Sequence, residues 1–150
     1  MPTPIKDPKE FLDMPGEQLD EIFRNSPAGE IPSGITDGTA IIAPGTKVSD
    51  NIARFVKHFG WQGKVFRPEK GDLINRTGIS GRTRIVAKVY KGKSWFDDKE
   101  CIVIDYSKTS LLAKWIRDEI REVSPGLYLG VVYGGKKKLI HFALKFPASA

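Results

Sequence analysis

RDEIREVSPGLYLGVVYGGKKKLIHFALKF, residues 117–146, is the stretch that decides the fold. Its extended segments are separated by Ser124-Pro125-Gly126 and by Gly134-Gly135. Proline fixes φ near the value that a turn requires, and glycine supplies the positive φ that closes a hairpin. The chain therefore folds back on itself twice here, which predicts consecutive antiparallel strands.

Upstream of these hairpins, the hydrophobic pattern changes at Gly60 from a helical period to alternation. In residues 83–91, Ile85, Ala87 and Val89 share one face of an extended chain, as in a half-buried antiparallel strand. Similar short segments, Trp95-Phe96 among them, continue to residue 146 and give about seven or eight strands, a number that suits a small closed barrel. We therefore expect a mainly β protein with an antiparallel up-and-down β-barrel over residues 61–146.

The residues before the barrel are expected to complete a single domain of 1–150. Three prolines in residues 1–13 predict an extended arm, and residues 14–60 are expected to be helical and loop segments. Two short helices are predicted there, one around 15–25 and one over 49–59, each with an apolar stripe at helical spacing. The segment 38–45 is compatible with either a strand or a buried loop.

Residues 111–123 fit two patterns. Their apolar side chains fall on one face of a helical wheel, but Pro125-Gly126 joins segments of equal length if this stretch is extended. We favour a short helical turn over 110–114 followed by a strand, with a continuous helix as the alternative.

Composition restricts the class of protein. Of the 150 residues 40% are hydrophobic and 28% are charged, as in an ordinary globular domain. No apolar run reaches the roughly 18 to 20 residues of a membrane-spanning helix. A lone cysteine, Cys101, and an amino terminus without the apolar core of a secretory signal predict a cytoplasmic protein.

The charge balance suggests one alternative partner. Lys and Arg number 24 against 18 Asp and Glu, a net charge of +6. An excess of positive charge is typical of proteins that bind nucleic acid or anionic surfaces. The basic residues are dispersed, however, and the densest run, Lys136-Lys137-Lys138, falls at an expected hairpin turn. Nucleic-acid binding is therefore disfavoured.

The candidates for chemistry cluster in residues 117–122, where charges fall on both faces of a strand. Some of these charges must point inward if the sheet closes, and buried charges persist only when they are paired or bound. A ladder of ion pairs on a solvated face is the commoner arrangement for such a segment. The functional interpretation is that Asp118 or Glu122, together with Arg121, points inward and orients a ligand. Asn75 and Tyr106 are similar candidates.

Other kinds of site find little support in the sequence. His58, His141 and Cys101 have no spacing typical of a metal site, so no metal is predicted. The sequence contains no nucleophile elbow, phosphate-binding loop or dinucleotide fingerprint. The sequence does not identify a cofactor, so its cofactor stays unknown at this point.

At Trp61-Gln62-Gly63-Lys64-Val65-Phe66, and again at Gly126-Leu127-Tyr128-Leu129-Gly130, the chain resembles uncharacterised bacterial lipocalin-like (calycin) domains. The fuller pattern of these domains, Gly-x-Trp-x-Gly, is incomplete here, because position 59 is Phe59. The resemblance extends loosely over residues 29–146. It implies a lipocalin-like barrel that binds an apolar ligand, and it brings no established catalytic residues.

The function expected from the sequence is binding of a small hydrophobic or amphipathic molecule, such as a fatty acid, terpenoid, polyketide or tetrapyrrole, inside the barrel. A first alternative is an enzyme of cyclase, isomerase or lyase type in the same barrel, with Asp118, Glu119 or Glu122 as general base and a tyrosine as its partner. A second is binding of nucleic acid or an anionic surface by the basic face. The predicted ligand-binding residues are Trp61, Lys64, Asn75, Tyr106, Asp118, Arg121 and Tyr128.

Overall fold

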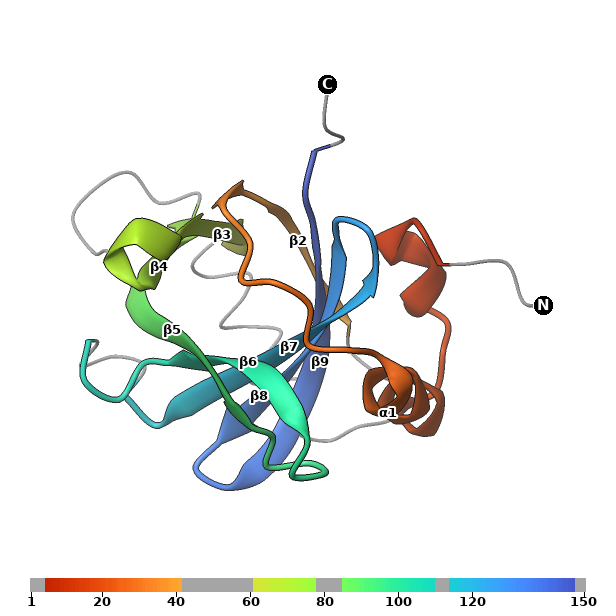
Figure 1. The fold of residues 1–150 in the computed structure, drawn as a ribbon. Helices are drawn as coiled ribbons and strands as arrows, with labels where there is room; N and C mark the ends of the chain where they lie inside the picture. Colours follow the sequence, from red (N-terminus) through yellow and green to blue (C-terminus); the bar gives the residue numbers. More distant parts are fainter. Residues whose placement is uncertain (1–4, 42–60, 78–84, 110–113, 148–150) are drawn as a thin grey trace.

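The structure is a computed structural model that describes residues 5–41, 61–77, 85–109 and 114–147. Within these residues, nine antiparallel strands form one sheet that curls into a nearly closed barrel (Figure 1). The order of the strands is β1-β3-β4-β5-β6-β7-β8-β9-β2, so consecutive strands from β3 to β9 are neighbours. The expected mainly β, up-and-down barrel is confirmed. The strands are β1 Gly34–Ile35, β2 Asp37–Ile41, β3 Trp61–Arg67, β4 Asp72–Thr77, β5 Val86–Lys93, β6 Glu100–Asp105, β7 Ile116–Ser124, β8 Leu127–Gly134 and β9 Lys137–Lys145.

Strands β1 and β2 close the barrel by pairing with its two ends. β1 pairs with β3, and β2 pairs with β9 from Asp37 opposite Lys145 to Ile41 opposite His141. Thr36, between the two strands, donates its amide N–H to the carbonyl of Lys64 at 2.9 Å. The barrel therefore begins near residue 34, which corrects the expected boundary at residue 61. Of the ambiguous segment 38–45, residues 38–41 are strand, and the rest lies outside the described residues.

Residues 116–124 form a strand, so the extended interpretation of this segment is confirmed. β7 pairs with β8 around the turn at Gly126, whose φ of 77° belongs to the left-handed region that glycine favours. The helical turn expected over 110–114 falls largely outside the described residues. The Trp95-Phe96 segment is different from the expectation: it lies in the turn between β5 and β6.

The amino-terminal region contains one of the two expected helices. α1 (Gly16–Asn25) buries Leu19 and Phe23; the second expected helix, 49–59, lies outside the described residues. Residues 8–11, expected as part of an extended arm, instead form the 3-10 helix η1 (Pro8–Phe11). Asp7 and Glu10 cap this helix reciprocally, and Phe11 is fully buried. A further 3-10 turn, η2, spans Pro68–Lys70.

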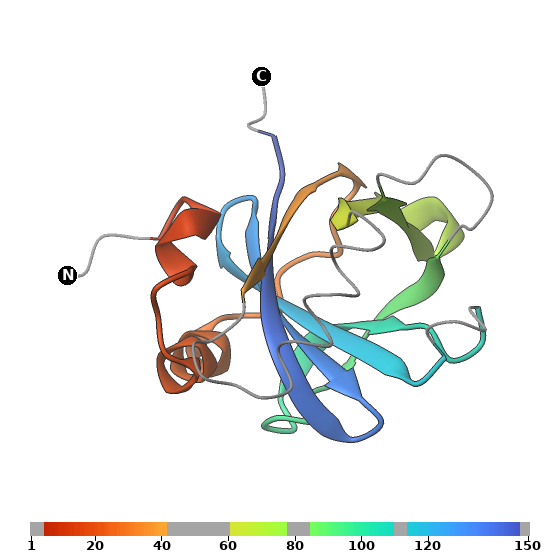
Figure 2. The ribbon, with the colours of Figure 1, turned by 180° about the vertical axis from the view of Figure 1, so that it is seen from behind.

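Alternation along the strands creates two apolar cores, one on each face of the sheet. The inner core lies inside the barrel, and the outer core lies between the sheet and α1 with η1. Figures 1 and 2 show both helices on the outside of the barrel, where η1 contacts β2 and β9 and α1 contacts β7. The inner core consists of Phe66, Leu73, Ile85, Ala87, Val89, Ile102, Ile104, Tyr106, Ile120, Tyr128, Phe142 and Leu144.

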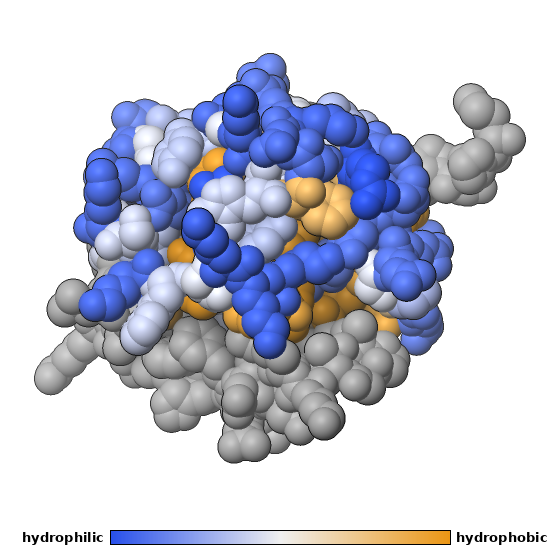
Figure 3. All heavy atoms as spheres, turned by 90° about the horizontal axis from the view of Figure 1, so that it is seen from below, coloured by the Kyte–Doolittle hydropathy of each residue, from blue (hydrophilic) through white to orange (hydrophobic). Residues whose placement is uncertain are grey.

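Seen from below, the surface is largely hydrophilic, with apolar residues showing only in limited areas between polar ones (Figure 3). No helix in the described part of the chain is long and apolar enough to cross a membrane.

Candidate functional site

Polar side chains from four strands or their ends meet inside the apolar barrel. Three of them follow from strand alternation, since each lies two positions from an inner-core residue: Lys64 from Phe66, Asn75 from Leu73, and Asp118 from Ile120. Tyr106 follows β6, and Trp61 begins β3. We call Trp61, Lys64, Asn75, Tyr106 and Asp118 the interior polar cluster.

Lys64 is the centre of this cluster. Its Nζ lies 2.7 Å from Asn75 Oδ1, 2.7 Å from Tyr106 Oη and 3.2 Å from Asp118 Oδ2. Three acceptors match the three N–H groups of an ammonium, so the geometry is that of a lysine cation paired with a carboxylate. Lys64 and Asp118 are both 3% exposed.

The remaining members complete the hydrogen bonding around this ion pair. The Tyr106 hydroxyl donates to Asp118 Oδ2 at 3.2 Å, while Asn75 Nδ2 donates to Tyr106 Oη at 2.9 Å and to the Ile85 carbonyl at 3.1 Å. Trp61 Nε1 donates to Asn75 Oδ1 at 3.1 Å. Because Asn75 Oδ1 receives two donors, the orientation of this amide is fixed.

One atom of the cluster has no partner. Among the buried side-chain nitrogen and oxygen atoms in the described part of the chain, only Asp118 Oδ1 makes no hydrogen bond. Buried polar atoms are almost always hydrogen-bonded, and leaving an acceptor unpaired costs about 1–3 kcal/mol, more if it is charged. This acceptor without a hydrogen bond is the most unusual polar feature of the barrel interior.

Burial dominates the electrostatics of the cluster. It lowers the pKa of Lys64 and raises the pKa values of Asp118 and Tyr106, since each charged form loses its hydration. The attraction between Lys64 and Asp118 opposes both shifts without cancelling them. Perturbed pKa values of this kind gather at binding and catalytic sites, although structural ion pairs also produce them.

Aromatic rings surround the ammonium group. Lys64 Nζ lies 5.4 Å from the ring centres of Tyr106 and Phe142 and 5.6 Å from that of Trp61. The Trp61 and Phe142 rings meet edge to face at 5.9 Å. A Cβ at Gly130 would overlap the Phe142 ring, so this glycine makes room for the wall of the site.

Two further residues position Lys64 through its backbone. Thr36 Oγ1 donates to the Lys64 carbonyl at 2.8 Å and accepts from the Lys64 amide at 3.0 Å. Gly63 forms a β-bulge with a φ of 145°, and a Cβ there would overlap the Thr36 carbonyl. The sequence interpretation missed both roles. A glycine inside a strand is a signal for a bulge or a close backbone approach, whereas nothing marked Thr36 in advance.

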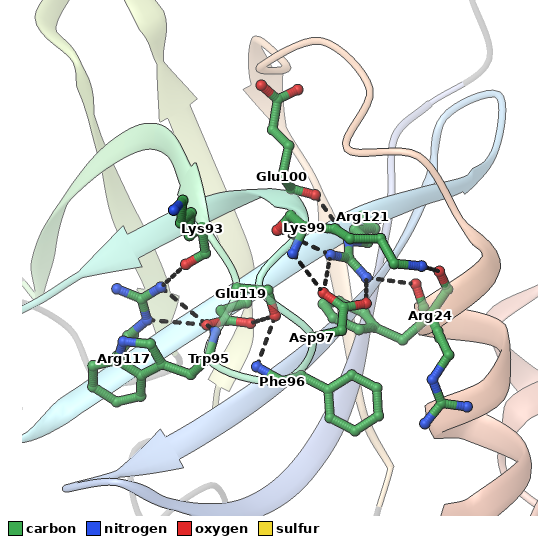
Figure 4. A network of polar contacts seen from close by, with 12 residues as sticks. Arg24, Lys93, Trp95, Phe96, Asp97, Lys99, Glu100, Arg117, Glu119 and Arg121 are labelled. Carbon is green, nitrogen blue, oxygen red and sulfur yellow. Dashed lines mark hydrogen bonds and ion pairs between the residues drawn. The ribbon is translucent and has the colours of Figure 1, made fainter.

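Arg121 does not join the cluster, and the expectation that it points inward is wrong. It lies on the outer face of β7, where its guanidinium makes a two-pronged contact with Asp97 at 2.7 Å (Figure 4). It also donates to the carbonyls of Phe23, Lys99 and Glu100. Since odd and even residues of a strand face opposite ways, an inward Asp118 and Ile120 require an outward Arg121.

The outer face of β7 is buried rather than solvated, contrary to the alternative interpretation of the charged segment. Glu119 is fully buried and accepts from Ser94 Oγ at 2.6 Å and from the Trp95 amide at 2.7 Å (Figure 4). Arg117 reaches the same carboxylate at 3.0 Å and lies over the Trp95 ring at 4.3 Å. These contacts tie the β5–β6 turn to β7 and have a structural role.

Tyr128 faces the inner core but not the cluster, since its hydroxyl donates to the Glu30 carbonyl at 3.0 Å. Glu122, at the other end of β7 from the cluster, lies against Gly29. His141 is on the outer face, with Nε2 2.9 Å from Asp20 Oδ1 of α1; His58 lies outside the described residues. No group of three or more His, Cys, Asp or Glu side chains in the described segments could hold a metal ion.

Comparison with known proteins supports the fold. No family model and no curated protein matches the sequence. A crystal structure of a protein from Thermomonospora curvata resembles this chain with a TM-score of 0.65 and 14% identity, covering 91% of this chain and 90% of that chain. At this identity the likeness shows the fold alone.

Proposed function

We propose that this protein binds a small amphipathic molecule in a lipocalin-like manner, with the apolar body of the ligand inside the barrel and its polar group at the interior polar cluster. One observation carries the proposal. The cluster is hydrogen-bonded throughout except at Asp118 Oδ1, a buried carboxylate oxygen without a partner. A ligand that contacts this oxygen would remove the cost of leaving it unpaired.

The inner core is suited to the apolar part of such a ligand. Its side chains are aliphatic or aromatic apart from the cluster itself. Removing apolar surface from water contributes about 25 cal/mol per Å², so a few hundred Å² give several kcal/mol before the costs of association. Apolar contact would then supply most of the affinity, and the polar cluster would fix the orientation of the ligand.

The experiment is native mass spectrometry of the protein purified from its own host. We expect a retained small molecule that organic extraction releases. Asp118→Asn should retain less of it, whereas the control Asp105→Asn should retain as much as the wild type, because Asp105 is on the outer face of the neighbouring strand and bonds Tyr90 and Ser107. An empty wild-type protein that also takes up no added hydrophobic molecule would refute the proposal.

Acid–base catalysis in the same barrel is the second candidate, and the position of Asp118 favours it. Of the three carboxylates considered as a general base, Glu119 is held outside the barrel and Glu122 lies at the far end of β7. Asp118 is inside, 3.2 Å from the Tyr106 hydroxyl, and burial raises its pKa.

Substrate screening with single amide variants tests this second candidate. Turnover should be lost in Asp118→Asn and kept in Glu122→Gln. If the wild type retains a ligand but turns over no compound in the screen, the catalytic candidate is refuted and binding is left as the function.

A further inference from the structure

In the interior polar cluster every hydrogen-bond donor is engaged, whereas one acceptor is not. All three N–H groups of Lys64 have acceptors, and so do the Tyr106 hydroxyl and the Trp61 indole. Both N–H groups of the Asn75 amide are also engaged. The cluster therefore has no hydrogen-bond donor left for a ligand.

Its acceptors are nearly as fully used. Asn75 Oδ1 receives Lys64 and Trp61, Tyr106 Oη receives Lys64 and Asn75, and Asp118 Oδ2 receives Lys64 and Tyr106. The one acceptor of the cluster that receives no hydrogen bond is Asp118 Oδ1. A group that bonds to it must carry an N–H or an O–H.

Charge narrows the choice between possible donors. The Lys64 cation and the Asp118 anion compensate each other, so the cluster as a whole is neutral. A ligand carboxylate would find no donor and would face the Asp118 carboxylate. A ligand ammonium would bring an uncompensated charge into an apolar interior, which is costly. Arg121, a second buried cation, lies on β7, is engaged with Asp97 outside the barrel and cannot balance a ligand anion.

We infer that the ligand is a neutral amphiphile whose polar end is an uncharged hydrogen-bond donor, the hydroxyl group of an aliphatic alcohol or a phenol being the simplest, that donates to Asp118 Oδ1. This inference rests on the proposed function and specifies its ligand class. It disfavours free fatty acids, which a lipocalin-like barrel would otherwise suggest, because they are ionised at neutral pH and would need to take up a proton to donate to Asp118. Terpenoid alcohols and phenolic polyketides have the required chemistry.

Matched ligand series test the inference with the unmodified protein. The first series is decanol, methyl decyl ether, decanoate and decylamine; the second, rigid series is naphthol, methoxynaphthalene and naphthoate. Dissociation constants come from calorimetry and from native mass spectrometry of equimolar mixtures at neutral pH. A hydrogen bond to a charged acceptor corresponds to about a tenfold to hundredfold gain in affinity, so the alcohol of each series should bind tighter than its ether and its acid by that factor, and decanol tighter than decylamine.

Asp118→Asn supplies a second, independent readout. In this variant the side-chain carbonyl oxygen at position 118 would accept from Lys64 and Tyr106. The side-chain NH₂ group would then stand in the place of Oδ1 and donate instead of accepting. Preference should then shift from the alcohol to the ether, which only accepts. Asp105→Asn, the outer-face control, should keep the preference for the alcohol. If Asp118→Asn does not fold, the wild-type comparison decides alone.

The possible failures are distinguishable. If no member of either series binds, the proposed function falls. If members bind but the alcohol has no advantage over its ether, or the acid or amine binds tighter, the proposed function stands and the inference about the hydroxyl group is wrong.

Discussion

The buried Lys64–Asp118 pair makes a strong prediction about folding stability. Lys64→Met would leave the Asp118 carboxylate buried with one oxygen already unpartnered, and Asp118→Leu would leave the Lys64 ammonium without its counter-ion. Removing one partner of a buried ion pair costs about 3–5 kcal/mol, against about 5–15 kcal/mol for the whole stability of a domain. The double variant removes both charges and leaves the Tyr106 hydroxyl without an acceptor, at a cost of about 1–3 kcal/mol.

The double variant should therefore be more stable than the sum of the two single changes implies, by at least about 3 kcal/mol. Urea denaturation at neutral pH, followed by tryptophan fluorescence and circular dichroism, measures this coupling if the m-values of the four proteins agree. The matched control is Lys91 and Glu100, whose charged groups are 3.9 Å apart on the surface. Their coupling should be below about 1 kcal/mol.

The pH dependence of Lys64→Met provides a further check. Burial already raises the pKa of Asp118 above that of an unfolded aspartate, and losing Lys64 raises it further. The full penalty is present above the folded pKa and disappears as pH falls through that value toward the unfolded pKa. The deficit of Lys64→Met relative to wild type should thus shrink on acidification. Additive single costs, or a deficit that grows in acid, would refute this account of the cluster.

Three other predictions concern the framework of the barrel. Burial raises the pKa of Cys101 to about 12 and leaves its thiol fully inaccessible, so iodoacetamide should alkylate it in urea and not in the native protein. The Arg121 guanidinium lowers the pKa of Asp97, so Asp97→Asn should destabilise the protein by about 1.5–3 kcal/mol at neutral pH. The gap in unfolding free energy should begin to narrow below about pH 4, the pKa of an unfolded aspartate, and close as pH falls through the lowered pKa of folded Asp97. Gly130→Ala should cost about 1–3 kcal/mol because its Cβ overlaps a core ring, while Gly16→Ala, which meets nothing within 4 Å, should change the melting temperature little.

Local patterns were sufficient to predict much of the barrel and its interior. Alternation predicted the up-and-down strands, and the charges on both faces of residues 117–122 predicted that some of them face inward. Five predicted ligand-binding residues, Trp61, Lys64, Asn75, Tyr106 and Asp118, meet in one cluster. The same alternation could have predicted that Arg121 faces outward. Ile120 is the apolar residue of the charged segment 117–122 and should face the core, so its neighbour Arg121 should face the other way.

The features that sequence reasoning missed depend on contacts between distant parts of the chain. Glu119 is buried because the β5–β6 turn folds over β7. The pairing of residues 34–41 with both ends of the sheet follows from barrel closure, which no local pattern specifies. By contrast, the cap formed by Asp7 and Glu10 is a short-range signal that the proline content of residues 1–13 obscured.

The split pairing of β1 and β2 has a consequence for how this polypeptide must be made. Strands β1 and β2 are synthesised before β3, but β2 can pair only after β9 has emerged from the ribosome. The pairing of Ile41 with His141 therefore forms late. Until then the edge strands of the nascent sheet have unpaired backbone N–H and C=O groups, which can pair with neighbouring chains. Holdase chaperones that shield such edges should matter more to the yield of this protein than to its final stability.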